Sequence, residues 1–259
     1  MLAWDEGWSL PSANLVLPND EVHVWRACLD QPATTLERLT QTLSADEQRR
    51  AERFYFERHR RRFIVARGVL RAILGRYLGL EPDQVEFAYG AQGKPALANG
   101  CYGDDLFFNL SHSHKLALYA VTRHRQVGVD LEYIRVVTDD ERIAASTFSA
   151  RENREWRTLL KVKQREAFFN CWTRKEAYIK AIGDGLSRPL DQFDVSLVPG
   201  EPARLLNVIG HPEEAARWCL KELAPAPGYA AALAAEGQGW HLVCLQWVGN
   251  ENPTSICTG

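Results

Sequence analysis

The segment Val127-Gly128-Val129-Asp130-Leu131-Glu132 places two carboxylates where they could share a cation. Side chains alternate between the two faces of a strand, so Asp130 and Glu132 project from one face and the apolar residues from the other. Two carboxylates on one strand face repel each other unless a cation sits between them. A hard divalent ion such as Mg²⁺, which prefers oxygen ligands, is the simplest such cation.

A second segment, residues 171–186, has the periodicity of a helix and could complete this site. Trp172, Glu176 and Lys180 recur at i, i+4 and i+8 and therefore line one face. Glu176 could supply a third oxygen ligand, although an exposed Glu–Lys pair at this spacing is also a common surface pattern. Trp172 is compatible both with a core position and with contact to a ligand. The strand and the helix together favour a Mg²⁺ site formed by Asp130, Glu132 and Glu176.

These segments resemble the 4′-phosphopantetheinyl transferases of the surfactin type, which have a Gly-x-Asp-x-Glu strand and a Trp-x-x-Lys-Glu-Ala-x-x-Lys helix. Both motifs are complete here. Three more occur in the family order: Gly93-Lys94-Pro95, Phe108-Asn109-Leu110-Ser111-His112-Ser113 and the stretch from Gly185-Leu186-Ser187 through Pro189. The matched region spans roughly residues 40 to 196, and five motifs in one order are a specific signal.

The resemblance implies an enzyme of the holo-acyl-carrier-protein synthase type. Such enzymes transfer 4′-phosphopantetheine from coenzyme A to a serine of an apo acyl or peptidyl carrier protein and release adenosine 3′,5′-bisphosphate. The resemblance further implies dependence on Mg²⁺, with Mn²⁺ as a substitute. Phosphoryl-type transfer depends mainly on positioning and electrostatics, so we expect the metal to neutralise the diphosphate and align it for in-line attack.

The family pattern also implies roles for individual residues. Glu176 is the expected base for the carrier serine, with Glu132 or a metal-bound water as alternatives. Lys180 is expected to stabilise the leaving group, and Asp130 takes part in catalysis through the metal. Contacts to coenzyme A are implied for a set of basic and hydroxyl residues: Arg50, Arg67, Arg71, Lys94, Ser111, His112, Lys175 and Lys180.

One position departs from the family pattern. Many members have a basic residue where this chain has Glu47, which is better explained as the second half of a capping box that begins at Ser44. The clamp on the 3′-phosphate of coenzyme A is therefore expected to consist of Arg50, Arg71 and His112, with one contact missing.

Composition excludes several other classes of protein. The chain has 259 residues and a formal net charge of −2, so it carries no overall basic field that would attract nucleic acid. Its first residues lack the layout of a secretory signal, and no apolar run is long enough to cross a bilayer. The six cysteines are scattered, which favours free thiols in a reducing compartment over disulfides or zinc ligands. We therefore expect a cytoplasmic protein without nucleic-acid or membrane partners.

The elements that must position these residues recur twice along the chain. Capping boxes at Ser44 and Ser149 each precede a long helix, over about residues 61–78 and 164–182, and each half is expected to end in a hairpin, over 116–132 and 230–247. This duplication predicts an α+β fold of two pseudo-symmetric halves. Each half is expected to have a long helix on a small antiparallel sheet. The family resemblance implies the same fold, with the active site in the cleft between the halves.

The division of labour between the halves follows from the same alignment. Residues 1–132 are expected to form the nucleotide side of the cleft, and residues 133–259 the metal and diphosphate side. The alignment places Arg71 opposite Glu176, so the two long helices should offer opposite charges to the cleft. A chain that contains both halves has little need to dimerise, which favours a monomer.

Two rival functions and one docking surface follow from the residues. Strand carboxylates near a lysine also occur in metal-dependent nucleases, but a basic, aromatic-rich stripe is missing. A catalytically silent binding module is the other rival. Ile134, Val136 and Val137, flanked by Arg135 and Arg142, could be core residues or an apolar lip for an acidic carrier protein, and we favour the lip.

Overall fold

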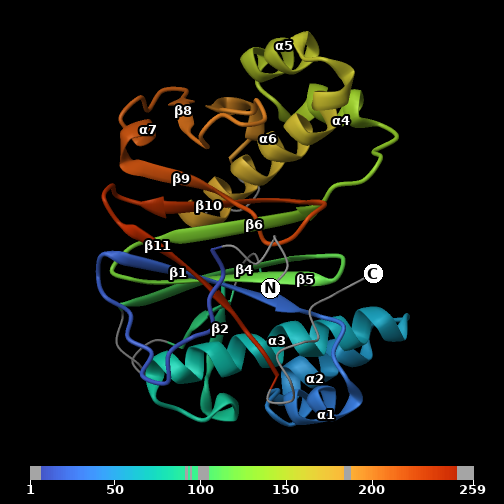
Figure 1. Cartoon of the computed structure of the whole chain (residues 1–259), viewed down its shortest axis with the longest axis vertical. Coiled ribbons are helices and arrows are strands. Elements are labelled where there is room, and N and C mark those ends of the chain that lie inside the picture. Colours follow the sequence, from blue (N-terminus) through green and yellow to red (C-terminus); the bar gives the residue numbers. More distant parts are fainter. Residues whose placement is uncertain (1–6, 91–92, 94, 99–104, 184–187, 250–259) are drawn as a thin grey trace.

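Two helices of 22 residues each, α3 (Glu57–Leu78) and α6 (Lys161–Ile182), form the outer layers of the fold. The computed structural model describes residues 7–90, 93, 95–98, 105–183 and 188–249. Both helices end at a glycine in the left-handed conformation, Gly79 and Gly183, which is the residue that tolerates this backbone best. Between the helices lie two sheets, one mixed and one antiparallel, so the layers run helix, sheet, sheet, helix (Figure 1). The expected α+β class is confirmed.

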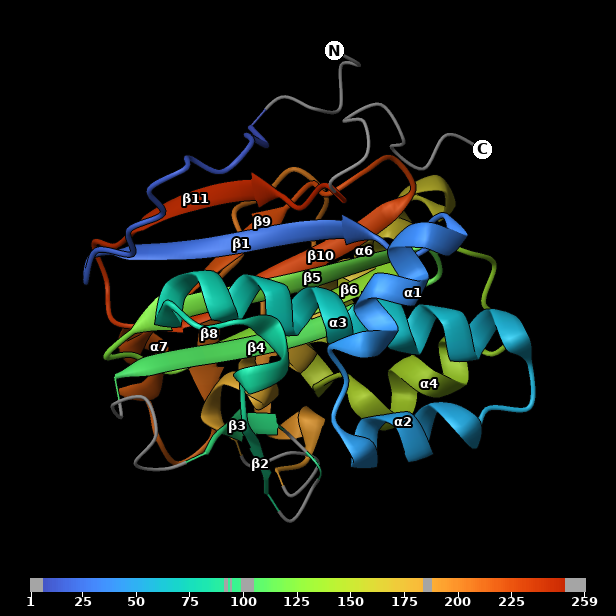
Figure 2. The same cartoon turned by 90° about the horizontal axis from the view of Figure 1, so that it is seen from below.

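The first half carries the sheet on which α3 packs. Its sheet order is β11-β1-β5-β4, and Figure 2 shows α3 lying across it. The strands are β1 (Glu21–Cys28), β4 (Leu106–Ser113), β5 (Leu116–Arg123) and β11 (His241–Gln246). The other elements of this half are α1 (Ala33–Gln41), α2 (Ala45–Glu52), the 3₁₀ turn η2 (Pro82–Gln84), β2 (Phe87–Tyr89) and β3 (Pro95–Leu97).

The second half repeats this plan. Its sheet order is β6-β10-β9, which matches β1-β5-β4 strand for strand. The strands are β6 (Val127–Tyr133), β9 (Trp218–Leu223) and β10 (Tyr229–Glu236). The remaining elements are α4 (Asp140–Thr147), α5 (Ala150–Thr158), the 3₁₀ turn η4 (Leu190–Gln192), β7 (Phe193–Val195), β8 (Leu205–Val208) and α7 (Glu214–Arg217). Both expected capping boxes form, so the duplication read from the sequence is a feature of the fold.

Neither expected hairpin forms, and this corrects the sequence analysis. β5 pairs with β4 through a turn at His114, whereas β6 pairs with β10 in the other sheet. β11 likewise leaves β10 and lies parallel to β1. The physical reason is burial: β1, β5, β6 and β10 are apolar on the faces where the two sheets meet, and stacking the sheets encloses one shared core. Consecutive strands therefore separate into different layers.

The two sheets do not coincide with the expected division of the chain at Glu132. Nearly all of β6 precedes this position, yet β6 belongs to the second sheet, and β11 belongs to the first.

The cysteines and the helices bear on two further expectations. Cys171, Cys219 and Cys244 are free thiols, as expected, whereas Cys28 is disulfide-bonded. Within the described residues, no helix combines the length and the apolar character needed to cross a membrane.

Candidate active site

The two sheets are joined along their edge strands, β4 and β6, by side chains rather than by a backbone ladder. Asn109 Oδ1 accepts a hydrogen bond from the Val129 amide at 2.9 Å. Ser111 donates to Asp130 Oδ1, and Ser113 donates to Glu132 Oε2, each at 2.9 Å. These three β4 residues alternate along the strand and so share the face that looks toward β6. We call the set Asn109, Ser111 and Ser113 the β4 seam. The sequence analysis missed Asn109 and Ser113, although their spacing of two from Ser111 was a visible signal.

Asp130 lies at the centre of the candidate site. Its side chain is buried, and Oδ1 accepts from Ser111 and from the Lys180 ammonium, the latter at 2.6 Å. Among the described residues, the other oxygen, Oδ2, is buried without a hydrogen-bond partner. A buried carboxylate oxygen that lacks a partner costs free energy, so it marks a position where a cation or a donor would bind favourably. The predicted meeting of β6 with Lys180 of α6 is therefore present.

Gly128 allows α6 to come this close to β6. A Cβ atom at this position would overlap the Ala177 carbonyl oxygen and the Ala181 backbone nitrogen. Gly128, Asp130 and Glu132 share one strand face, so the absent side chain of the first lets the helix present Glu176 and Lys180 to the other two. Glycine is required here for space, because its backbone is not in the left-handed region.

The three carboxylates influence one another electrostatically. Burial raises the pKa of Glu132, with a further upward contribution from Asp130, while the Ser113 hydrogen bond and Lys180 act in the opposite direction. Burial, Asp130 and Glu132 likewise raise the pKa of Glu176. Glutamates whose pKa is raised by burial and by a neighbouring carboxylate are typical of functional sites, including those that hold a cation.

The residues present fit a hard divalent ion. Their potential ligands are all carboxylate oxygens, and Asp130 Oδ2 has an unmet bonding capacity. Among the residues that the structure describes, however, no group of three or more His, Cys, Asp or Glu is arranged as a metal-ligand set. The Lys180 ammonium supplies positive charge to Asp130 in this arrangement. The Mg²⁺ site at Asp130, Glu132 and Glu176 thus remains a prediction.

The remaining residues near this site are placed as follows. His112 lies on β4 with part of its surface exposed. The surrounding protein partly desolvates its imidazole and the Lys180 charge is close, and both effects lower the pKa of His112. Trp172 stacks on Phe168 with ring centroids 6.4 Å apart and packs against the core while staying partly exposed, which is compatible with both of its interpretations. Lys94 and the Gly185-Leu186-Ser187 motif lie outside the described residues.

Glu47 is buried and pairs with two arginines of α3. Arg67 Nε donates to Glu47 Oε1 at 2.6 Å, and Arg71 Nε donates to Oε2 at 2.7 Å. Arg71 also donates from Nη1 to the carbonyls of Pro82 and Val85, and it is only 2% exposed. Arg71 therefore ties α2 and η2 to α3, and the structure does not bring it to the surface for contact with a phosphate.

Lys175 occupies the equivalent place in the second half. Its ammonium contacts Glu152 Oε2 at 2.8 Å and donates to the carbonyls of Leu190 and Phe193, and the residue is 1% exposed. In both halves the acceptors are the first residue of the 3₁₀ turn and the residue after it. Arg71 is thus the counterpart of Lys175, one position away from the expected Glu176. The expectation that Arg71 and Glu176 face one cleft was wrong, and the burial of Lys175 argues against contact with the diphosphate.

Arg50 and Tyr89 form the exposed edge of the first-half cluster. Arg50 is exposed at the end of α2, and its guanidinium lies 5.8 Å from the centre of the Tyr89 ring. Arg67 Nη2 donates to the Tyr89 hydroxyl at 2.7 Å. Arg50 and Arg67 therefore meet at one aromatic residue, which the sequence analysis did not single out.

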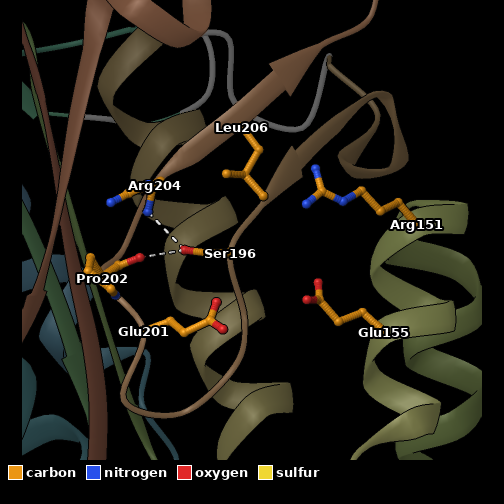
Figure 3. A pocket seen from close by; sticks show the side chains of 7 residues that line it. All are labelled: Arg151, Glu155, Ser196, Glu201, Pro202, Arg204 and Leu206. Carbon is orange, nitrogen blue, oxygen red and sulfur yellow. Dashed lines mark hydrogen bonds between the residues drawn. The ribbon is translucent and has the colours of Figure 1, made fainter.

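Two hollows lie on other parts of the second half. One, of about 220 Å³, is lined by two arginines and two glutamates besides Ser196, Pro202 and Leu206, and its Ser196 hydroxyl is bonded within the protein (Figure 3). The other, of about 350 Å³, is lined by Ile134, Lys161, Val162, Arg165 and Glu166. The second has two apolar, two basic and one acidic lining residue, and Ile134 belongs to the segment that follows β6.

Comparison with known proteins decides the family. A sequence model of the 4′-phosphopantetheinyl transferase superfamily matches residues 126–234, and one of the N-terminal region of these transferases matches residues 24–124. The 4′-phosphopantetheinyl transferase HetI of Nostoc sp. is 48% identical over 233 residues, which cover 90% of this chain and 95% of the relative. The chain belongs to the 4′-phosphopantetheinyl transferases.

More distant relatives agree with this assignment. The 4′-phosphopantetheinyl transferase Sfp of Bacillus subtilis (strain 168) is 30% identical over 163 residues, 62% of this chain and 69% of the relative. In the present chain, the two family models meet between residues 124 and 126, where β5 is followed by β6. Membership of the family implies coenzyme A and a carrier protein as substrates.

The β4 seam gives a first prediction for this transferase. Ser113→Ala should reduce kcat about 10-fold, because Glu132 loses the hydroxyl that fixes its carboxylate. Ser113→Thr keeps a hydroxyl and should restore most of the rate. Steady-state kinetics with a carrier protein measure both effects, and Ser12→Ala, far along the chain, serves as the control. Equal rates for Ser113→Ala and wild type would show that Glu132 is oriented by other groups.

Proposed function

We propose that this enzyme transfers 4′-phosphopantetheine from coenzyme A to the serine hydroxyl of an apo acyl or peptidyl carrier protein, with Mg²⁺ held by Asp130, Glu132 and Glu176. The observation that best supports the site is the buried Asp130 carboxylate. Its Oδ1 is bonded to Ser111 and Lys180 while its Oδ2 lacks a partner. When bound, the metal would neutralise the diphosphate and favour in-line displacement.

Side chains of the protein accept the proton of the carrier serine and stabilise the negative charge of the leaving group. The serine oxygen forms a bond to the phosphorus of the phosphopantetheine, and the bond to adenosine 3′,5′-bisphosphate breaks. Glu176 takes the serine proton, which is consistent with its raised pKa, with Glu132 as the alternative base. Lys180, already at the carboxylate cluster, stabilises the negative charge of the leaving group. His112, exposed at the end of β4, is suited to contact the nucleotide.

Mass spectrometry tests the proposed function. Apo carrier proteins from fatty-acid, polyketide and nonribosomal-peptide systems are incubated with enzyme, coenzyme A and Mg²⁺, and we expect at least one to gain the mass of one phosphopantetheine group. Reactions without coenzyme A, or with a chelator, are the controls. Nicking of plasmid DNA with Mg²⁺ instead would favour the nuclease alternative. Binding of coenzyme A without any modified carrier would favour the silent module.

Of the three residues expected to form an apolar lip, Ile134 and Val137 pack partly against the core and Val136 is exposed. We propose that Val136, together with Leu160 and Val162, receives the carrier protein. Val136, Leu160 and Val162 are between 70% and 83% exposed, and Ile134 and Val162 line the same groove. Lys161, Arg165 and Glu166 line it too, and Arg135 and Arg142 are exposed on the neighbouring segment, so basic residues outnumber acidic ones among these five. Exposed apolar side chains within a basic rim complement an acidic helix that has apolar residues next to its serine.

The lip gives a selective prediction. Val136→Asp should raise the KM for the apo carrier several-fold while the affinity for coenzyme A and the melting temperature stay nearly unchanged, because the side chain is exposed. Ile209→Asp, at another exposed apolar residue, is the matched control and should leave the carrier KM unchanged. An unaltered carrier KM in Val136→Asp would place docking on another surface.

A further inference from the structure

The buried ionic cluster of the first half carries an unbalanced positive charge. Glu47 is its one carboxylate, and Arg67 and Arg71 are its two guanidinium groups; all three side chains are buried. Adding Asp46 and Arg50, which also act electrostatically on Tyr89, still leaves one positive charge. Unbalanced charge in a desolvated position is costly unless an anion can approach it.

The second half shows that this charge is not required by the fold. Its equivalent carboxylate, Glu152, pairs with the single cation Lys175. The other oxygen of Glu152 accepts the Val195 amide at 2.7 Å, where Glu47 accepts Arg67. The same helix-to-helix connection thus exists in a neutral form in one half and with an extra arginine in the other. The extra arginine, Arg67, therefore calls for an explanation beyond packing.

Tyr89 connects Arg67 to the surface. Its hydroxyl oxygen accepts from Arg67, and among the described residues the hydroxyl proton has no acceptor. Burial raises the pKa of Tyr89, so the phenol keeps this proton at neutral pH. Tyr89 is 37% exposed, which leaves it open to a ligand. A hydroxyl that accepts a hydrogen bond from a cation becomes a stronger donor, because the two bonds polarise each other.

We propose that the Tyr89 hydroxyl is a further donor to the 3′-phosphate of coenzyme A, beside Arg50, for which the family resemblance already implies this contact. Arg67, which donates to the Tyr89 oxygen, would strengthen that donor. This inference rests on the proposed function, because it takes coenzyme A as the donor. The phosphate would receive one hydrogen bond from the Tyr89 hydroxyl and one charged contact from Arg50, and its negative charge would offset the unbalanced cluster. Tyr89 would thereby replace the phosphate contact that a basic residue makes in many family members, at the position where this chain has the buried Glu47.

Isothermal titration of the full chain tests this assignment with two probes. Adenosine 3′,5′-bisphosphate carries the 3′-phosphate of coenzyme A, and adenosine 5′-monophosphate lacks it. Tyr89→Phe should weaken binding of the bisphosphate about 10-fold, as expected for loss of one hydrogen bond to a charged group, and should leave the monophosphate unaffected. Tyr55→Phe is the matched control, because Tyr55 is a tyrosine of the same half that is 92% exposed.

A second variant keeps the test decisive. Arg50→Gln removes an exposed charge that takes part in no ion pair among the described residues. Like Tyr89→Phe, it should reduce the ratio of the affinities for the bisphosphate and the monophosphate. If wild type prefers the bisphosphate and both variants retain that preference in full, the phosphate lies elsewhere and the inference is overturned. If wild type binds neither the bisphosphate nor coenzyme A, the proposed function itself fails. Should Tyr89→Phe lose its fold, Arg50→Gln decides alone.

Discussion

Asp130→Asn should lower the rate of carrier modification roughly 100- to 1,000-fold while the protein remains folded. The amide keeps the shape of the side chain but removes the charge that attracts a metal ion and the Lys180 ammonium. Two effects on stability oppose each other, since the variant loses an ion pair and relieves repulsion from Glu132 and Glu176. We therefore expect only a small change in melting temperature.

Metal binding separates this prediction from a general loss of activity. Electron paramagnetic resonance of Mn²⁺ added to the enzyme should show bound ion for wild type and much weaker binding for Asp130→Asn. Asp83→Asn, at an acidic residue of η2 in the first half, is the control and should behave as wild type. Near-normal Mg²⁺-dependent turnover in Asp130→Asn would refute the assignment of Asp130.

Gly128→Ala should destabilise the protein by about 3 kcal/mol or more and reduce activity by a larger factor than the stability loss explains. The added methyl group meets the backbone of α6 at Ala177 and Ala181, and backbone atoms cannot move aside as a flexible side chain can. The helix must shift away from β6, which displaces Glu176 and Lys180 from Asp130. A displacement of about 1 Å at a reacting centre costs roughly 100-fold in rate.

Denaturant unfolding and kinetics on the same preparations measure both parts. Gly128→Ala combined with Ala177→Gly provides the control, because trimming the neighbouring side chain leaves the backbone obstacle in place and should give no rescue. Val129→Ala, on the opposite strand face, should cost stability while preserving far more activity per folded molecule. A fully active, stable Gly128→Ala would show that α6 does not depend on this close approach.

Short-range sequence patterns predicted the catalytic face well. Alternation along residues 127–132 placed Asp130 and Glu132 together, and helical spacing placed Lys180 where it reaches Asp130. The capping boxes at Ser44 and Ser149 also form. These features depend on neighbours within a few residues, so the local periodicity is sufficient to indicate them.

The sequence did not predict which strands, or which buried charged residues, pair with each other over long distances along the chain. A short polar connection after β5 has the same local signal whether the next strand continues the sheet or crosses to another, and only the shared core decides. Arg71 and Lys175 look like ligand residues because they are charged and close to motif positions. Their partners, Glu47 and Glu152, lie on other helices, so their burial follows from tertiary packing.

The pairing of β11 with β1 has a consequence for synthesis of the protein. Because residues 241–246 pair with residues 21–26, the outer edge of β1 stays open until this late part of the chain has been made. A truncated chain that stops after β10 would contain every residue proposed for catalysis and yet present an unpaired strand edge, which favours association between nascent molecules. Shortening the C-terminal region should therefore reduce the yield of folded enzyme more than the chemistry of the molecules that do fold.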